Sequence, residues 1–395
     1  MRTSSRRPFF DSCQSMLKPL LLSLILLPGS SWLTTVSAAP LETAAKQAII
    51  IDHDTGIVLF EKDARRPMPP ASMTKIMTAY MVFEALERGD IQEDTLFTVS
   101  EEAWRRGGVQ SGSSTMFLKL GSQVPVIDLI RGVIIQSGND ACIVLAEGLA
   151  GSEDAFARRM TERAREMGLQ SATFRNATGW PDEGHEISAS DLATLSRDLI
   201  ARFPDRYKIY SERSFTWNGI SQGNRNPLLG SFTGADGIKT GSTSVSGYGL
   251  VGSALRDGER RTIVVNGLGS QSERASVARE IMSAAFRDFD IKSLYQPGDQ
   301  IGFIPVYMGK AEDVGVVVRD DIQIGFERTD RDEIKARIDY TPAVAPVEAG
   351  SKIADLVVTK SGEEVGRYPL YATDAVARKG FFGRVGASLA QKIRG

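Results

Sequence analysis

Three short strings, far apart in the chain, limit the fold of this 395-residue sequence more than any other feature. They are Ser72-Met73-Thr74-Lys75, Ser137-Gly138-Asn139 and Lys239-Thr240-Gly241. The serines that begin the first two strings are 65 positions apart, and Lys239 follows Ser137 by 102 positions. Each string carries hydroxyl, amide or amine groups that could act on one substrate. We therefore expect a fold that brings the three strings to one place.

The first string combines a serine and a lysine three residues apart. On a helix such residues share a face, so the Ser72 hydroxyl and the Lys75 amine can meet. Burial and nearby positive charge lower the pKa of a lysine, which can then take the proton of a serine nucleophile. A serine at a helix N-terminus also offers a backbone N–H to an oxyanion. Alone the string is weak evidence, because about one chance match is expected in a chain of this length.

The other two strings also have ordinary structural explanations. Ser137-Gly138-Asn139 lies between two expected helices and, taken alone, favours a helix–helix turn that Asn139 caps. Lys239-Thr240-Gly241 stands at the head of an expected strand and would suit an edge strand beside a glycine-rich turn; Gly241 would let another backbone approach closely. In this order and spacing, however, the three strings mark the penicilloyl-serine transferases, with a chance match below roughly one in a thousand.

Longer stretches around these strings identify a family. The chain resembles the serine D-alanyl-D-alanine carboxypeptidases, which are low-molecular-mass penicillin-binding proteins with a C-terminal β-domain. The resemblance covers nearly all of the chain after residue 38. It rests on residues 70–75, 136–142 and 236–241, and on the flanking stretches 113–118, 224–226 and 380–383.

The resemblance implies a catalytic role for several of these side chains. Ser72 would attack the peptide bond between two terminal D-alanines and form an acyl-enzyme, after Lys75 takes its proton as general base. Ser137, hydrogen-bonded to Lys75 and near Lys239, would relay the proton to the leaving D-alanine. Asn139 would orient the substrate. Water would then release the shortened peptide, so the chemistry needs no metal or cofactor.

A second group of residues would bind the substrate. The backbone N–H groups of Ser72 and Ser242 would form the oxyanion hole; Ser242 stands where close relatives often have histidine. Lys239, Thr240 and Gly241 would receive the free carboxylate, with Arg274 as the carboxylate-binding arginine and Arg225 as a weaker candidate. The alternative for either arginine is an ordinary salt bridge.

Two further residues near these strings receive no catalytic role. Cys142 is expected to be a small core residue rather than a second nucleophile. His185 follows a loop near the expected site and is assigned no function.

The pattern of apolar residues predicts an α+β or three-layer fold in residues 39–290, with helices in the middle and a sheet contributed from both ends. The family resemblance adds that the sheet is antiparallel and has helices on both faces, as in the penicillin-binding protein and serine β-lactamase transpeptidase fold. Expected helices cover residues 72–86, 124–135, 141–149, 153–167, 191–200 (with Ser190 as N-cap) and 273–286. Expected strands cover residues 48–51, 56–60, 237–240, 248–254 and 261–267.

After Pro297-Gly298 the pattern changes to short apolar runs about ten residues apart. Such spacing predicts a small all-β sandwich or barrel, which we place at residues 291–374. We find no catalytic constellation in this part.

The two ends of the chain suggest export and membrane attachment. Residues 1–38 have a basic start, a short apolar run at 20–27 and small residues at Val36-Ser37-Ala38, which is typical of a signal peptide. The alternative is a buried N-terminal helix. Residues 375–395 lack acidic groups and show apolar residues at helical spacing, which suits a basic amphipathic helix on a membrane surface, or else a packing helix or a frayed tail. We expect a periplasmic protein held on the outer face of the inner membrane.

Composition excludes two classes of function. The net charge is −2, so the cationic surplus of a general nucleic-acid binder is missing. With two cysteines and two histidines in the sequence, a His/Cys zinc site is nearly excluded. After removal of residues 1–38 only Cys142 remains, which leaves no internal disulfide.

Three alternative functions compete with the carboxypeptidase. A β-lactamase needs a glutamate-positioned water, typically in a Glu-x-x-Leu-Asn string, and the region before Lys239 has none. Endopeptidases of this kind usually lack the β-domain and the tail. A peptidoglycan- or β-lactam-binding sensor with little turnover would not need all the catalytic groups, which are intact here.

Overall fold

The computed structural model describes residues 41–380. The expected signal peptide therefore lies outside the described residues, and so do residues 381–395 of the expected C-terminal helix. Residues 375–380 are described and are not helical. Val376 and Arg378 instead form isolated β-bridges with Val347 and Gly309, so a helix does not begin at residue 375.

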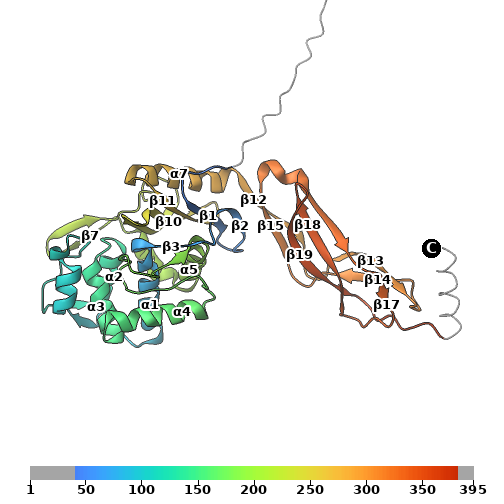
Figure 1. Ribbon diagram of the computed structural model, residues 1–395, viewed down its shortest axis with the longest axis horizontal. Helices are drawn as coiled ribbons and strands as arrows, with labels where there is room; N and C mark the ends of the chain where they lie inside the picture. Colours follow the sequence, from blue (N-terminus) through green and yellow to red (C-terminus); the bar gives the residue numbers. More distant parts are fainter. Residues whose placement is uncertain (1–40, 381–395) are drawn as a thin grey trace, which may run out of the picture. The chain divides into compact units, whose positions relative to one another are not determined.

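A five-stranded antiparallel sheet lies at the centre of the larger part of the chain (Figure 1). The strand order β2-β1-β11-β10-β9 places strands from both ends of this part side by side, as expected. Its strands are β1 (Gln47–Asp52), β2 (Val58–Lys62), β9 (Ala235–Thr243), β10 (Gly247–Arg256) and β11 (Glu259–Leu268).

Helices cover both faces of this sheet, because alternate residues of each strand point to opposite sides. In β1, Ile49 and Ile51 belong to one apolar core, whereas Ala48 and Ile50 belong to another. The first core includes residues of α1 (Lys75–Arg88), α2 (Val126–Ile134), α3 (Asn139–Ala150), α4 (Glu153–Glu166) and α5 (Ala189–Arg202). The second is closed by α7 (Gln271–Arg287). The prediction of an α+β fold with helices on both faces is confirmed.

The structure shows neither of the two N-caps considered for α5 and α3. Helix α5 begins at Ala189, and its N-cap is Ser188 rather than Ser190, since the Ser188 hydroxyl accepts a hydrogen bond of 3.0 Å from the Asp191 N–H. Asn139 does not cap α3; it is the first residue of that helix, after Gly138. The error at α5 follows from two serines that both suit a cap.

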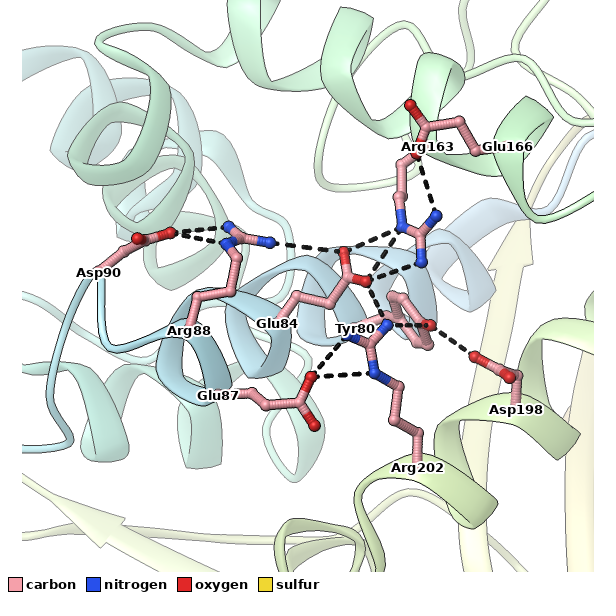
Figure 2. Close-up of polar contacts among 9 residues, drawn as sticks. All are labelled: Tyr80, Glu84, Glu87, Arg88, Asp90, Arg163, Glu166, Asp198 and Arg202. Carbon is pink, nitrogen blue, oxygen red and sulfur yellow. Dashed lines mark hydrogen bonds and ion pairs between the residues drawn. The ribbon is translucent and has the colours of Figure 1, made fainter.

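A cluster of charged side chains joins α1, α4 and α5 (Figure 2). Glu84 of α1 is buried and makes ion pairs with Arg163 of α4, at 2.9 Å, and with Arg202 of α5. Beside it, the Tyr80 hydroxyl donates a hydrogen bond of 2.5 Å to Asp198. These contacts fix the helix whose N-terminal end carries Lys75.

Small elements connect the main ones. They are β3 (Pro67–Met68) with β6 (Ile187–Ser188), β4 (Leu96–Thr98) with β5 (Gln123–Pro125), β7 (Ser214–Trp217) with β8 (Ile220–Gly223), the short helix α6 (Pro204–Tyr207), the 3-10 turns η1 (Ala71–Thr74), η3 (Val109–Ser111) and η4 (Lys208–Ser211), and the π-helical turn η2 (Ala103–Gly107).

The C-terminal part is all-β, as predicted. A six-stranded sheet has the order β16-β18-β19-β14-β13-β17, and a separate ladder pairs β12 with β15. Leu356, Val358 and Leu370 are among its buried core residues. The elements are β12 (Phe289–Tyr295), β13 (Gln300–Tyr307), β14 (Asp313–Val317), β15 (Ile322–Glu327), η5 (Arg328–Glu333), β16 (Ile334–Asp339), β17 (Ala343–Val344), β18 (Lys352–Lys360) and β19 (Glu363–Ala372).

Between residues 41 and 380 there is no helix that combines the length and apolar character needed to span a membrane.

Candidate active site

Ser72 and Lys75 meet at the junction of a 3-10 turn and a helix. Ser72 lies in η1, which runs directly into α1 at Lys75. Residues three apart eclipse each other in a 3-10 turn, and the Lys75 Nζ lies 3.0 Å from the Ser72 Oγ. A side-chain carbon at Gly241 would stand 2.8 Å from the Pro70 carbonyl oxygen, so glycine lets β9 approach this turn.

The Lys75 amine has two further partners besides Ser72. Its Nζ lies 2.7 Å from the Asn139 Oδ1 and 2.5 Å from the Thr178 carbonyl oxygen. The Asn139 side chain is itself oriented, because its Nδ2 donates to the Ser113 hydroxyl at 2.9 Å. Both oxygens can only accept hydrogen bonds. An uncharged amine that donates its two N–H groups to them directs its lone pair at Ser72.

The surroundings favour this uncharged form. Lys75 is 1% exposed, and burial, followed by the positive charge of Arg225, lowers its pKa. Burial also lowers the pKa of Lys239 well below its usual value, and the charge of Lys75 adds to this effect. The site therefore holds two buried amines that lose their protons more easily than lysines in water.

Ser137 pairs with Lys239 rather than with Lys75. The Lys239 Nζ donates a hydrogen bond of 3.1 Å to the Ser137 Oγ. Among the hydrogen bonds of residues 41–380 none joins Ser137 to Lys75, so the expected contact between these two is not present. Ser137 lies in the turn between α2 and α3 with φ +59°, which orients its hydroxyl towards β9.

Two hollows flank Ser72. One, of about 490 Å³, is lined by Ser72, Asn139, Trp180 and the segment from Gly112 to Ser114, among others. The other, of about 340 Å³, brings together Ser72 and Ser137 with all the other expected substrate-binding residues except Lys239: Thr240, Gly241, Ser242, Arg225 and Arg274. Ser72 thus stands between two spaces that can receive the two sides of a scissile bond.

The two arginines of the second hollow carry no ion pair among the described residues. Arg274 is 5% exposed; its guanidinium lies 5.7 Å from the centre of the Tyr248 ring, and its buried Nε has no hydrogen-bond partner. The Arg225 Nη1 donates to the Ser114 hydroxyl at 2.5 Å. Burial lowers the pKa of each guanidinium. Such cations lack a protein counter-ion and suit an anionic group of a substrate.

Sequence reasoning missed some groups of the site. The Thr178 carbonyl belongs to the backbone, and Ser113, Trp180 and Tyr248 lie outside the three strings. Cys142 is buried in the core, as expected, and burial raises the pKa of its thiol to about 12. Residues 41–380 contain no cluster of histidine, cysteine and acidic side chains suited to a metal ion.

Comparison with known proteins decides the family. The family model described as D-alanyl-D-alanine carboxypeptidase matches residues 34–269, and the model described as the C-terminal domain of penicillin-binding protein 5 matches residues 289–378. The chain belongs to the D-alanyl-D-alanine carboxypeptidase family. It is a serine-type hydrolase of the low-molecular-mass penicillin-binding proteins, which confirms the resemblance seen in the sequence.

Curated relatives of this carboxypeptidase match over most of their length. DacD of Salmonella typhimurium is 36% identical over 89% of this chain and 91% of its own. DacA of Escherichia coli K12 is 35% identical over 86% of each chain. Both are named D-alanyl-D-alanine carboxypeptidases.

Solved structures agree with the sequence relatives. DacD from Francisella tularensis has a TM-score of 0.79 and 30% identity, and the match covers 87% of this chain and 96% of that one. Penicillin-binding protein 5 from Haemophilus influenzae has a TM-score of 0.70 and 34% identity over 87% and 100% of the two chains. The fold prediction is thereby confirmed across both parts of the molecule.

Proposed function

We propose that this carboxypeptidase removes the terminal D-alanine from peptidoglycan stem pentapeptides through an acyl-enzyme on Ser72. Lys75 takes the proton of the Ser72 hydroxyl while Oγ attacks the carbonyl carbon of the last peptide bond. The backbone N–H groups of Ser72 and Ser242 stabilise the oxyanion that forms. The observation that carries the proposal is the buried Lys75 amine 3.0 Å from the Ser72 Oγ.

The C–N bond then breaks, and the leaving nitrogen needs a proton. Lys239 donates to the Ser137 oxygen, which leaves the Ser137 O–H free to point at the substrate. We assign to Ser137 the delivery of this proton. Its hydroxyl then turns from Lys239 to Lys75 and takes up the proton that Lys75 holds, which returns Lys75 to its uncharged form. D-Alanine leaves once its nitrogen carries the delivered proton. Water, deprotonated by Lys75, then attacks the ester and releases the shortened peptide and the Ser72 hydroxyl.

The free carboxylate of the substrate belongs in the hollow of about 340 Å³. Arg274 and Thr240 line it, and Lys239 stands beside Ser137 at its wall. Arg225, which lines both hollows, would orient the peptide together with Asn139. We expect Arg274→Gln to raise KM for the peptide about tenfold or more, because a charge-assisted contact is lost.

β-Lactams acylate the same serine, in keeping with the penicillin-binding family of this chain. We propose that the acyl-enzyme formed with a β-lactam is hydrolysed slowly. Penicillin-binding protein D2 from Listeria monocytogenes, 29% identical with a TM-score of 0.55, was solved with ampicillin bound. Fast multiple turnover of nitrocefin would instead identify a β-lactamase.

The catalytic experiment compares wild type with Ser72→Ala and with Ser244→Ala, an exposed serine nearby. Wild type and Ser244→Ala should release D-alanine from a synthetic peptide ending in D-Ala-D-Ala and carry one labelled penicillin at residue 72. Ser72→Ala should do neither. Peptide binding without release by wild type would favour a sensor over an enzyme.

We also propose the location and layout of the mature protein. Residues 1–38 are a signal peptide, residues 39–290 the catalytic domain, residues 291–380 the β-domain, and residues 381–395 a basic amphipathic membrane anchor. The basic and apolar patterns at the two ends support periplasmic export and attachment to the inner membrane. Deletion of residues 381–395 should move the protein from the membrane to the soluble periplasmic fraction.

A further inference from the structure

The turn formed by residues 176–180 lies directly against the turn that carries the nucleophile. A side-chain carbon at Gly179 would fall 1.9 Å from the Ala71 carbonyl oxygen, so the two backbones pack as closely as glycine permits. One residue earlier, the Thr178 carbonyl oxygen accepts the hydrogen bond from Lys75. Gly179 and Trp180 also line the larger hollow beside Ser72. The 176–180 turn is thus part of the wall of the site.

The side chain of Asn176 closes this turn from behind. Its Oδ1 accepts hydrogen bonds from the Gly179 N–H at 2.8 Å, the Trp180 N–H at 3.1 Å, the Thr178 hydroxyl at 3.0 Å and the Thr178 N–H at 3.3 Å. Its Nδ2 donates to the Trp180 carbonyl at 3.1 Å. Asn176 is 6% exposed, so water cannot readily replace these partners.

The direction of the lone pair on Lys75 depends on the two oxygens that accept its N–H groups, the Asn139 Oδ1 and the Thr178 carbonyl oxygen. The Asn139 Oδ1 is held through Ser113. The Thr178 carbonyl is held in place by Asn176. The Asn176 Oδ1 accepts from the Thr178 N–H and from the Gly179 N–H, and so fixes the peptide unit before Thr178 and the one that contains its carbonyl. Thr78 donates to the Ala177 carbonyl and Glu153 accepts from the Ala177 N–H; these contacts anchor the segment but do not touch the peptide unit that carries the Thr178 carbonyl.

We propose that Asn176 is a positioning residue for the general base. Its side-chain amide holds the Thr178 carbonyl where it accepts one N–H of Lys75, and so keeps the amine lone pair aimed at the Ser72 hydroxyl. This inference rests on the proposed roles of Ser72 and Lys75. Asn176 itself touches neither the substrate nor the reacting atoms.

Asparagine suits this role because it combines an acceptor and a donor without charge. Aspartate at the same place keeps the acceptor for the four donors and loses the bond to the Trp180 carbonyl. It also adds a negative charge near Lys75. The charged and titratable groups that already act on Lys75 are Arg225, Lys239, Glu153, Asp140, Cys142 and His185. Substituting Asn176 alters none of them.

The test is the rate of acylation by a chromogenic cephalosporin across pH, expressed per active site. Active sites are counted by mass spectrometry as the final fraction of protein with an adduct at Ser72. Asn176→Ala should react 10- to 100-fold more slowly per active site, on the order expected for a misplaced catalytic group, while nearly all molecules finally acquire the adduct. Thr78→Val is the matched control, and should stay within about threefold of wild type because it removes only the tether at Ala177.

The aspartate variant supplies a second, independent readout. Asn176→Asp should recover most of the rate at high pH, because the acceptor is retained. The acid limb of its pH–rate profile should move to higher pH, because a nearby negative charge stabilises the ammonium form of Lys75. A fold defect alone would give neither the recovery nor the shift.

Three results would overturn the inference. They are a wild-type rate per active site in Asn176→Ala, a loss of adduct stoichiometry with no change in rate, and an equal slowing by Thr78→Val. Failure of wild type itself to form the adduct at Ser72 would contradict the proposed function first.

Discussion

The Nζ atom of Lys239 lies 3.1 Å from the hydroxyl oxygen of Ser137, in a site that also buries the amine of Lys75. Two lysines in one buried site would repel each other if both were charged. Burial lowers the pKa of each amine, and the charge of Lys75 lowers the pKa of Lys239 further. The arrangement thus favours uncharged amines, which can accept a proton, at the place where an acyl transfer needs a base.

These lysines make the stability of the protein depend on pH. Their pKa values are lowered in the folded state, so below the unfolded value of about 10.5 the unfolded chain binds more protons. The free energy of unfolding should therefore rise with pH through the alkaline range, by up to about 1.4 kcal/mol per pH unit for each lysine. Lys75→Met and Lys239→Met should each flatten the slope in urea unfolding between pH 7 and 10. An unchanged slope in both variants would contradict the lowered pKa values.

His185 should add a second rise of stability with pH, on the acid side of the stability curve. Its Nε2 lies 2.9 Å from the Thr74 hydroxyl, and its Nδ1 accepts from the Arg175 N–H. Burial, aided by the charges of Arg175 and Lys75, lowers the pKa of His185 to about 4. Between about pH 6.5 and 4 only the unfolded chain takes up the proton, so stability falls as pH falls, by about 3 kcal/mol.

The measurement is the difference in unfolding free energy between wild type and His185→Gln at pH 7 and at pH 4.5. The glutamine does not titrate, so the variant should lose less stability on acidification than wild type. Equal losses would show that other groups carry the acid sensitivity.

The ion-pair cluster of Figure 2 should contribute to stability rather than to chemistry. Glu84→Gln leaves Arg163 and Arg202 without their shared buried carboxylate, which should cost about 3 kcal/mol of unfolding free energy. Glu166→Gln removes the exposed partner of Arg163 and should change it by less than about 0.5 kcal/mol. Acylation per active site should be unchanged in both. A slowed acylation in Glu84→Gln would show that α1 transmits strain to Lys75.

Much of the fold follows from local pattern. The alternation in β1 assigns Ile49 and Ile51 to one face and Ile50 to the other, which is enough to predict a sheet covered on both sides. Strand β12 was not predicted, because Asp290, Lys292 and Ser293 interrupt its apolar residues. Strand β17 has two residues and is defined only by its pairing with β13.

The site was predictable where its side chains belong to a recognisable sequence string. The three strings meet around Ser72, but which amine pairs with Ser137 depends on angles that spacing does not encode. The Thr178 carbonyl has no sequence signature, since every residue has a backbone carbonyl. Asn176 becomes visible only when its five hydrogen bonds are seen to close one turn.

The contact between Gly179 and Ala71 yields the sharpest test of how tightly the site is packed. Gly179 has φ +84°, and an added side-chain carbon would overlap the Ala71 carbonyl oxygen at 1.9 Å. Gly179→Ala should lower the unfolding free energy by about 3 kcal/mol and slow acylation, because the nucleophile turn must shift. Gly184→Ala is the matched control: it has φ +71°, but its nearest neighbour is the flexible Arg175 end at 3.3 Å. It should cost about 1 kcal/mol from backbone strain alone and leave the acylation rate unchanged. If both variants lost the same stability and kept the same rate, close packing of these two turns would not be what holds Ser72 in place.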